Sequence, residues 1–545
     1  MAKYIVGPDL TATPSGYDGY YTDAVVAHNA LAANDELDFV GINPFVGTGI
    51  TKNLVIGSGS SPGVITTSGA NFVNITADAA GILTIGDVTI NAGAFSSSFM
   101  RFTRSTTISM IDTIININGV ITGSILYSSG SARIYSFDMS GAVVTVSAAA
   151  DVSIDNWFWP GSASTWALDV SDSIFTINSN EGTGGFWRAE EQADPSFTGN
   201  VFYNNRSTDA ANLAMILLQA TSAKGTCTID SNVAHVKQYA GLVLAIGKDA
   251  PATDPLLKNG YTTPSLSDNT VYGPAYFDTA AHDEAMYLHA LLVGNNINAS
   301  VYRNTVYGAG FGIVVKGNGD AASDTWSGYG IQYNLIHNCA YGLHVKGQHS
   351  VPVYHNTVVS TIPMKYHPVM VGDTSYAAND TIIKNNLIVL LDGMTKVDRA
   401  IMYIKNGTAI SDYNAFVISG TCLFGQVGAV TYATFADWVG AGYDVNSVCV
   451  VENSGSWDVY LGSAPGTISE TLDYCPVSDS GKLVNRSDNP LIGIGTWITG
   501  VNEEGQADLW GKYVHRLPNI GADQGAGAPK RPSRILNIGG NGILG

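Results

Sequence analysis

The chain has 545 residues, of which 13% are charged, and its 26 basic and 45 acidic side chains give a net charge of −19. This acidic balance argues against nucleic acid and against an anionic membrane surface as binding partners. The five cysteines lack CxxC spacing, so they indicate neither a zinc site nor a disulfide framework, and we expect no metal and no cofactor.

Residues 1–50 predict an N-terminal cap. KYIVGPD and ELDFVGI indicate short strands, and the segment between them places Val25, Val26 and Leu31 at helical spacing after Asp23, a typical N-cap residue. The chain begins without an apolar leader or a cleavage signal, and it has no run of roughly eighteen apolar residues. We therefore expect a protein made in a cytoplasm, with no signal peptide and no membrane insertion.

Residues 51–416 predict a solenoid. The first part alternates short apolar-polar strand patterns with turns rich in Gly and Ser, as in GILTIGDVTINAG. Beyond it one phrase recurs: an apolar residue, two residues, Asn, one residue and a second apolar residue. The spacing of its asparagines is 22 to 37 residues, which is typical of a solenoid. The copies have their asparagines at Asn204, Asn232, Asn269, Asn304, Asn334, Asn356, Asn386 and Asn414.

Repeated strands of this kind predict an all-β coil in which stacked turns of parallel strands bury a shared core. Asn suits the bend between two strands because it tolerates a left-handed backbone and bonds locally. Stacked in register, these side chains would also bond to one another as a structural ladder. We predict the ladder for Asn232, Asn269, Asn304, Asn334, Asn356 and Asn386. The alternative is that Asn is only a common turn residue.

Residues 417–526 carry a resemblance to a known family. Three phrases, WVGAGYDVNS, NPLIGIG and NIGA, resemble the closing segments of right-handed parallel β-helix repeat proteins of the pectate-lyase-like superfamily. The matching positions are Trp438, Gly442, Asp444, Ser447, Asn489, Pro490, Ile492, Gly495, Asn519, Ile520, Gly521 and Ala522. The resemblance implies a right-handed, single-stranded β-helix with an N-terminal cap helix. It also implies that 417–526 form the last turns and a closing cap. Residues 527–545 change to a basic, Pro-bearing and then Gly-rich composition, which indicates a flexible tail or one that docks on a partner subunit.

Catalytic candidates are few. Sugar-cleaving β-helices carry carboxylates on the outside of neighbouring turns, yet the outward positions of the repeated phrase show no adjacent acids. Asp283 and Glu284 follow a long insertion and are the best acidic candidates. Lys346 takes the place of Lys316 one repeat later, and a lyase needs a base beside a cation that binds carboxylate. The alternative for the lysines is a solvated pair that discourages edge association.

Aromatic residues offer a binding alternative. Trp157, Trp159 and Trp166 lie within ten residues of one another, and Trp187 follows about one turn later. Exposed Trp faces stack on sugar rings, although Trp is as often a core residue. We interpret these four residues as candidate glycan-binding positions.

The long solenoid, its cap and the lack of a legible catalytic constellation favour a structural virion protein of a bacteriophage. Such a tailspike, fibre or capsid spike would present the β-helix to a host-surface polysaccharide, with other virion proteins as partners and a homotrimer as the expected assembly. One alternative is a polysaccharide lyase or glycoside hydrolase. Another is an extracellular bacterial adhesin.

Overall fold

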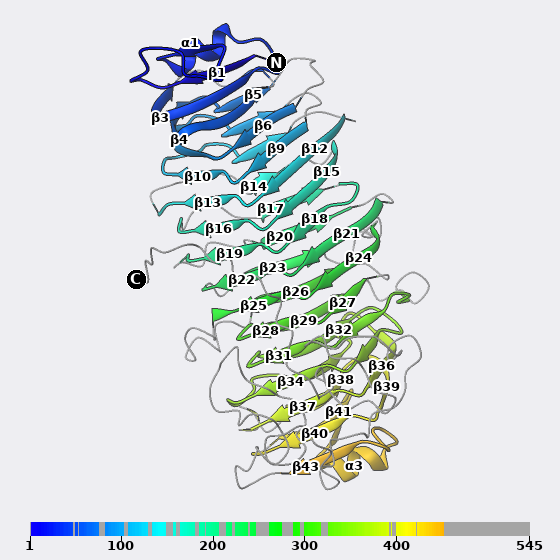
Figure 1. Cartoon of the computed structure of the whole chain (residues 1–545). Coiled ribbons are helices and arrows are strands. Elements are labelled where there is room, and N and C mark those ends of the chain that lie inside the picture. Colours follow the sequence, from blue (N-terminus) through cyan, green and yellow to red (C-terminus); the bar gives the residue numbers. More distant parts are fainter. Residues whose placement is uncertain are drawn as a thin grey trace.

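The computed structural model shows a single stack of parallel strands wound around one core (Figure 1). The predicted all-β, parallel β-helix is therefore confirmed. The residues described are 2–451 except positions 47–49, 53, 76–81, 103–106, 129–132, 149–155, 160–163, 180–184, 191, 207–213, 221–223, 238, 239, 247–260, 275–286, 295–298, 318–324, 392, 393, 395–398 and 421.

A 29-stranded sheet, here called the long sheet, receives two strands from each turn of the coil. The first series comprises β6 (Ile82–Gly86), β9 (Thr107–Ile111), β12 (Arg133–Ser140), β15 (Ser164–Ser171), β18 (Ser196–Thr198), β21 (Lys224–Asp230), β24 (Tyr261–Ser267), β27 (Ser300–Tyr302), β30 (Gly330–Gln332), β33 (Pro352–Tyr354), β36 (Ala378–Lys384) and β39 (Gly407–Asp412). The second series comprises β7 (Val88–Phe95), β10 (Ile114–Ile117), β13 (Val143–Val146), β16 (Ile174–Ile177), β19 (Val201–Asn204), β22 (Val233–Val236), β25 (Thr270–Tyr272), β28 (Thr305–Tyr307), β31 (Leu335–His337), β34 (Thr357–Ser360), β37 (Leu387–Leu390), β40 (Ala415–Ile418) and β43 (Val448–Val451).

A 14-stranded sheet, here called the short sheet, receives the third strand of each turn. It comprises β5 (Val73–Ile75), β8 (Met100–Phe102), β11 (Leu126–Ser128), β14 (Asn156–Trp159), β17 (Gly185–Glu190), β20 (Ala214–Gln219), β23 (Ala240–Ile246), β26 (Tyr287–Gly294), β29 (Phe311–Lys316), β32 (Tyr341–Lys346), β35 (Val369–Val371), β38 (Ala400–Ile404), β41 (Leu423–Val427) and β42 (Val430–Tyr432). Its neighbouring strands are parallel except β41 and β42, which form an antiparallel pair. Each turn therefore adds about 4.8 Å to the length of the coil.

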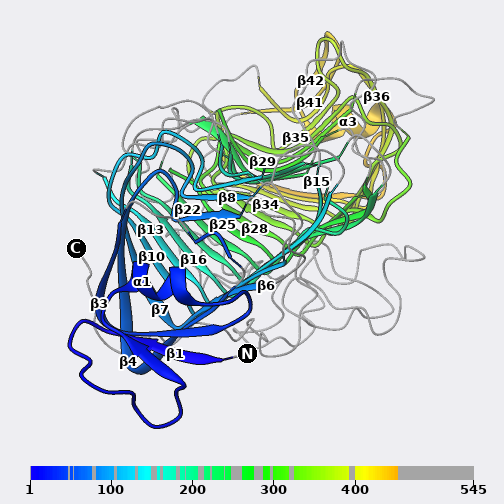
Figure 2. The same ribbon diagram turned by 90° about the horizontal axis from the view of Figure 1, so that it is seen from above.

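The N-terminal elements lie over one end of the coil (Figure 2). They are β1 (Lys3–Val6), β2 (Gly19–Tyr21), α1 (Ala24–Ala30), β3 (Glu36–Val46) and β4 (Val55–Gly69). Asp23 is the N-cap of α1, as predicted, and its carboxylate accepts two backbone N–H groups at 2.8 and 2.9 Å. The side chains of α1 that cover the core are Ala24, Ala27 and His28, whereas Val26 is 56% exposed. The small residues let the short helix sit close to the first turns.

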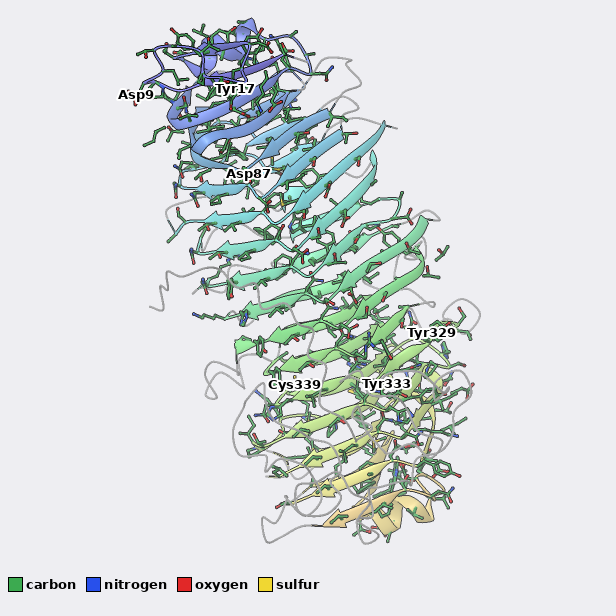
Figure 3. The ribbon with its side chains drawn as sticks, in the orientation of Figure 1. Asp9, Tyr17, Asp87, Tyr329, Tyr333 and Cys339 are labelled. Atoms are coloured by element: carbon green, nitrogen blue, oxygen red, sulfur yellow. The ribbon has the colours of Figure 1, made fainter. Side chains whose placement is uncertain are left out.

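Every turn bends where a residue in the left-handed region joins the first series to the second. These residues include Asp268, Arg303, Tyr333 and His355, with φ between 54 and 55° (Tyr333 is labelled in Figure 3). Each directly precedes a ladder asparagine. The prediction that the asparagine itself adopts the left-handed backbone is therefore wrong. The strain falls on a neighbour, at a cost of about 1 kcal/mol or more per turn.

The ladder asparagines lie one above another inside this bend and are at most 1% exposed. In each, the side-chain oxygen accepts both the Nδ2 and the backbone N–H of the asparagine one turn earlier. For Asn334 these donors belong to Asn304, at 3.0 and 2.8 Å. Each Nδ2 also donates to a backbone carbonyl, as Asn334 does to Val301 at 3.0 Å. The side-chain oxygen, the Nδ2 group and the backbone N–H of each such asparagine therefore have protein partners, and so does the backbone carbonyl that Nδ2 contacts.

The ladder is continuous from Asn200 to Asn414, so it extends one asparagine beyond the predicted set, Asn232 to Asn386, at each end. One copy of the repeated phrase was also assigned wrongly. Asn200 donates to Asn232 at 3.0 Å, whereas Asn204 lies at the far end of β19, opposite Val236. The correct copy of the phrase is FTGNVF, not VFYNN. Farther toward the N-terminus, Ser173 takes the same place and donates to the carbonyl of Ser171.

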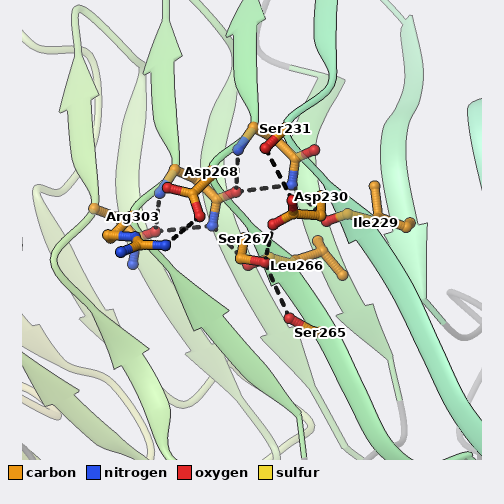
Figure 4. Close-up of polar contacts among 11 residues, drawn as sticks. Ile229, Asp230, Ser231, Ser265, Leu266, Ser267, Asp268 and Arg303 are labelled. Atoms are coloured by element: carbon orange, nitrogen blue, oxygen red, sulfur yellow. Dashed lines mark hydrogen bonds and ion pairs between the residues drawn. The ribbon is translucent and has the colours of Figure 1, made fainter. Parts of the chain in front are cut away.

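Carboxylates on the outside of the bend add a second layer of contacts (Figure 4). Asp230 accepts a hydrogen bond from Ser267 at 2.5 Å, and Asp268 pairs with Arg303 at 2.5 Å. Burial raises the pKa of Asp268, and the Arg303 guanidinium opposes that rise. The outer contacts therefore join the same turns that the ladder joins.

The C-terminal end of the described coil is closed by α3 (Phe435–Gly440), whose Trp438 is fully buried over the last turn. The Trp438 Nε1 donates to Asp444 at 2.8 Å, and the same carboxylate accepts from Asn414 at 2.8 Å and from Ser447 at 2.7 Å. Asp444 thus ends the ladder and holds the closing helix. The phrases NPLIGIG and NIGA, and the tail 527–545, lie outside the described residues.

Replacing one ladder residue tests this account. We expect Asn334→Ala to lower the free energy of unfolding by about 3 kcal/mol, because it leaves two donors of Asn304 and the carbonyl of Val301 buried without partners. Chemical denaturation followed by circular dichroism measures the change. Asn118→Ala, at an exposed position, is the control. Equal losses in the two variants would contradict the ladder's role.

Candidate functional site

The short sheet places alternate side chains of each strand outside the coil. In β32, Leu343 and Val345 enter the core, while His344 and Lys346 face away from it. The register pairs Lys316 of β29 with Lys346, so the two lysines occupy equivalent places on successive turns. The sequence predicted this alignment.

Five residues form what we call the basic cluster: Lys316, Lys346, Asp373, Tyr376 and Lys405. The Asp373 carboxylate pairs with Lys346 at 2.7 Å and with Lys405 at 3.3 Å. The ammonium groups of Lys346 and Lys316 lie 5.2 and 5.9 Å from the ring centroid of Tyr376. Three cations therefore share one carboxylate and one aromatic ring, which leaves the cluster with net positive charge.

Burial and charge set the protonation of these groups. Burial, followed by the like charge of Lys346, lowers the pKa of Lys316 to about 8. Burial alone would raise the pKa of Asp373, but hydrogen bonds from Lys346, the Thr374 backbone and Lys405 hold it well below its usual range. At neutral pH the carboxylate is ionised and Lys316 carries its charge, although it loses its proton more readily than an ordinary lysine.

Beside the basic cluster, aromatic rings from successive turns form what we call the aromatic column: His289, Phe311, Tyr341 and Tyr366. The rings of Phe311, Tyr341 and Tyr366 stack face to face, whereas His289 meets Phe311 edge to face. The centroid separations are 4.5 Å for His289–Phe311, 4.4 Å for Phe311–Tyr341 and 4.3 Å for Tyr341–Tyr366. The guanidinium of Arg399 lies 5.3 Å from the ring of Tyr366. Because stacked rings cover one another's faces, the column offers ring edges and polar groups more than open faces for a ligand.

His344 and His289 carry no charge at neutral pH. His344 is 5% exposed, its Nε2 lies 3.3 Å from the carbonyl of Gly372, and burial lowers its pKa to about 3. Burial likewise lowers the pKa of His289 to about 4. In both cases the Lys346 charge adds to the shift. The positive charge of the site therefore comes from lysine and arginine.

The other predicted site residues either lie outside the described residues or are buried. Asp283 and Glu284 lie outside the described residues, and so do the side chains of Trp157, Trp159 and Trp166. Trp187 is fully buried, and its ring stacks on Phe158 at 4.3 Å. The prediction that Trp187 presents a face to a glycan is therefore wrong, because the indole fills the core instead.

The structure also brings together two carboxylates that were not predicted from the sequence. Asp138 of β12 and Asp169 of β15 are in register on neighbouring turns. Burial raises the pKa of Asp138, and the charge of Asp169 adds to the rise. The strand spacing of about 4.8 Å approximates the separation of the two carboxylates in a retaining glycosidase. The signal was the shared pattern in FDMS and LDVS, which lies outside the repeated Asn phrase.

Other features of the described chain bear on metals and membranes. No three His, Cys, Asp or Glu side chains gather there to hold a metal ion. The cysteines at 227, 339, 422 and 449 are free thiols, two of them buried. Within the same residues, no helix has the length and apolar character needed to cross a membrane.

No protein-family model and no curated protein sequence matches this chain. The structure therefore supports the parallel β-helix itself, together with the closing phrase from Trp438 to Ser447, whose side chains bind one another as described above. Both are features of a fold that many activities share. Function must be argued from the outer surface of the coil.

The electrostatic coupling of the two stacked lysines can be measured. We expect Lys346→Met to raise the pKa of Lys316 above about 8, because a like charge disappears and Asp373 loses its nearer partner. The pH dependence of amine labelling at Lys316, followed by peptide mass spectrometry, reports this pKa. Lys384→Met, on the long sheet, is the matched control. An unchanged labelling midpoint in Lys346→Met would contradict the coupling.

Proposed function

We propose that this chain is a glycan-binding β-helix of a bacteriophage virion, a tailspike, fibre or capsid spike that contacts a host-surface polysaccharide. The observation that carries the binding proposal is the basic cluster beside the aromatic column on the short sheet. Positive charge gathers there in a chain whose net charge is −19. This local reversal of charge favours an anionic ligand.

The arrangement suits an extended ligand more than a compact one. The cluster and the column draw on β26, β29 and β32, on the connections on either side of β35, and on Lys405, which directly follows β38; these strands follow one another along the coil. Lysines on neighbouring strands therefore repeat along its axis, as do the tyrosine rings. A chain molecule with repeated negative charges, such as an acidic polysaccharide, would meet Lys316 and Lys346 on neighbouring turns and Lys405 farther along the coil.

The virion assignment is the less direct part of the proposal and comes from analogy of fold. A long, capped β-helix is a rigid rod, which suits a protein that reaches from a particle to a cell surface. A homotrimer and contacts with other virion proteins are the assembly that this role implies. Mass spectrometry of purified virus particles from the source should detect this chain. Its absence from the particles would exclude the virion role. An extracellular adhesin would instead be found on bacterial cells.

The binding proposal predicts the effect of removing the cluster's charge. We expect Lys316→Met, Lys346→Met and Lys405→Met, combined, to weaken binding to an acidic polysaccharide at least tenfold, which corresponds to about 1.4 kcal/mol. Calorimetry at two salt concentrations measures the affinity and its salt dependence. Lys384→Met should bind as the unmodified chain does. If the triple variant binds equally well, the basic cluster is not the binding site.

Binding should also depend on pH in a defined direction. An anionic ligand favours the charged form of Lys316, whose pKa is about 8. Affinity should therefore be greatest below pH 8 and should fall as the pH rises through this value. The single variant Lys316→Met should lose this step while retaining the contribution of Lys346. A pH profile that rises through 8 would contradict the role of Lys316 as a ligand cation.

A polysaccharide lyase is the second candidate, favoured by the lowered pKa of Lys316. Its neutral amine would take the proton next to a uronate carboxylate held by Lys346. The bond to the glycosidic oxygen would then break, a carbon–carbon double bond would form, and the leaving oxygen would take up a proton. Activity would rise as the pH passes 8, opposite to binding. Ultraviolet absorbance of unsaturated products from a panel of acidic glycans tests this, and no product from any glycan would exclude it.

A further inference from the structure

One tight turn carries both the carboxylate and the ring that the lysines of the basic cluster contact. It comprises residues 373–376 and follows β35. The backbone N–H of Asp373 donates to the carbonyl of Tyr376 at 2.8 Å, and the N–H of Tyr376 donates back to the carbonyl of Asp373 at 3.2 Å. Thr374 and Ser375, at the tip, are exposed. The Asp373 carboxylate and the Tyr376 ring therefore belong to one short, closed segment.

The base of the 373–376 turn is fixed to neighbouring strands. Gly372 has a φ of 74°, and its N–H donates to the carbonyl of Val345 at 2.7 Å. A Cβ atom at position 372 would lie 1.8 Å from the carbonyl oxygen of Asn406, so only glycine fits here. Because the backbone is held in place, the Asp373 carboxylate can leave the lysines by rotation of its own side chain, without movement of the strands.

The Asp373 carboxylate occupies the position that a ligand anion would take in the basic cluster. Its Oδ2 lies 2.7 Å from Nζ of Lys346, the last residue of β32, and its Oδ1 lies 3.3 Å from Nζ of Lys405, which directly follows β38. One carboxylate therefore bridges two ammonium groups from different turns of the coil. A uronate carboxylate or a sulfate group carries negative charge on similar acceptor oxygens, so it would use the same donors.

These ion pairs are open to exchange. The side chains of Lys346, Asp373 and Lys405 are 23, 26 and 31% exposed, so water reaches both pairs. Solvated ion pairs are weak, and an anion from solution can replace the carboxylate. A free anion must nevertheless compete with a group on the same chain, which acts at an effective concentration on the order of millimolar. A single anion therefore gains little from the site while Asp373 is present.

A polyanion competes on different terms. Lys316 is in register with Lys346 on the neighbouring strand, and both lysines lie near the ring of Tyr376. A polymer that first binds at Lys316 brings its next negative groups to Lys346 on the same molecule, so these groups are tethered as Asp373 is. The competition is then between two tethered anions, and the loss of affinity that Asp373 causes is smaller.

We propose that Asp373 is a specificity-determining residue of the basic cluster. It occupies Lys346 and Lys405 as an internal anion and thereby makes the cluster selective for polyanions over single anions. The ligand class of the site is then a polymer with repeated negative groups. This inference rests on the glycan-binding function proposed above, because it concerns the same cluster.

Calorimetry with inorganic sulfate, a single anion, and with dextran sulfate, a polymer of the same chemical group, tests the proposal. We expect Asp373→Asn to bind inorganic sulfate at least tenfold more tightly than the unmodified chain does, but dextran sulfate only about twofold more tightly. Asparagine keeps an oxygen that can accept the Thr374 N–H, as Asp373 does at 2.6 Å, so the turn can still form. Circular dichroism establishes that the variant is folded.

Two further variants separate the position of Asp373 from the net charge of the chain. Asp380→Asn removes an exposed carboxylate on β36, and it should bind both ligands as the unmodified chain does. Asp373→Glu keeps a carboxylate beside the lysines, so it should bind inorganic sulfate nearly as weakly as the unmodified chain.

The proposal is overturned if Asp373→Asn binds inorganic sulfate no more tightly than the unmodified chain, including the case in which neither binds it. An equal gain for both ligands, or an equal gain in Asp380→Asn, would overturn it as well. Failure of the binding function is a separate result. If the expected gains are found but no acidic polysaccharide binds the unmodified chain, the proposed function fails and the selectivity of the cluster stands.

Discussion

Each turn of this coil must change direction within one residue and still satisfy the polar groups of a buried bend. A left-handed residue makes the turn, and Arg303, Tyr333 and His355 carry that conformation at a cost of about 1 kcal/mol or more each. The adjoining asparagine makes several buried hydrogen bonds, each of net value about 1 kcal/mol. The ladder therefore offsets the strain. Because its bonds cross between turns, it also fixes the register of the long sheet.

The ladder could be predicted because Asn recurs at the bend in successive copies of the phrase, whereas the residue before it changes from copy to copy. The left-handed residue is Asp or Gly at the earlier bends but varies from Ser231 to Tyr413 at the later ones, so the repeated Asn phrase did not mark it. Asn204 was mistaken for the asparagine of a repeated phrase because β19 ends with an Asn at the expected distance from Val201. Local spacing did not separate the two candidates. The register between turns did, and register depends on contacts far apart in the sequence.

Of the residues in the basic cluster, the sequence predicted only the aligned lysines Lys316 and Lys346. Lys316 and Lys346 recur in the same phrase, so their alignment follows from the repeat. Asp373 and Tyr376 lie in a connection without a repeat, and only the coiled path brings them beside Lys346. Trp187 shows the opposite difficulty, because composition cannot tell an aromatic ring in the core from one outside it. Residues inside the repeat were predictable, and the residues that complete the site were not.

The core of the coil is apolar throughout, whereas the side chains on its outer faces differ from one face to another. Function must therefore be sought on the outer faces. Core residues such as Val345 and Ile336 point into the coil, so they do not determine which groups a ligand meets outside it. Outward positions are relieved of packing, so one column can hold lysines while another holds Val359 and Val389. An apolar outward column is costly unless it is covered, and a charged one is costly unless it is solvated or paired. Asp373 pairs with Lys346 and Lys405, and the ring of Tyr376 lies near Lys346 and Lys316, so the charged column on the short sheet is held by polar and aromatic neighbours and not by core packing.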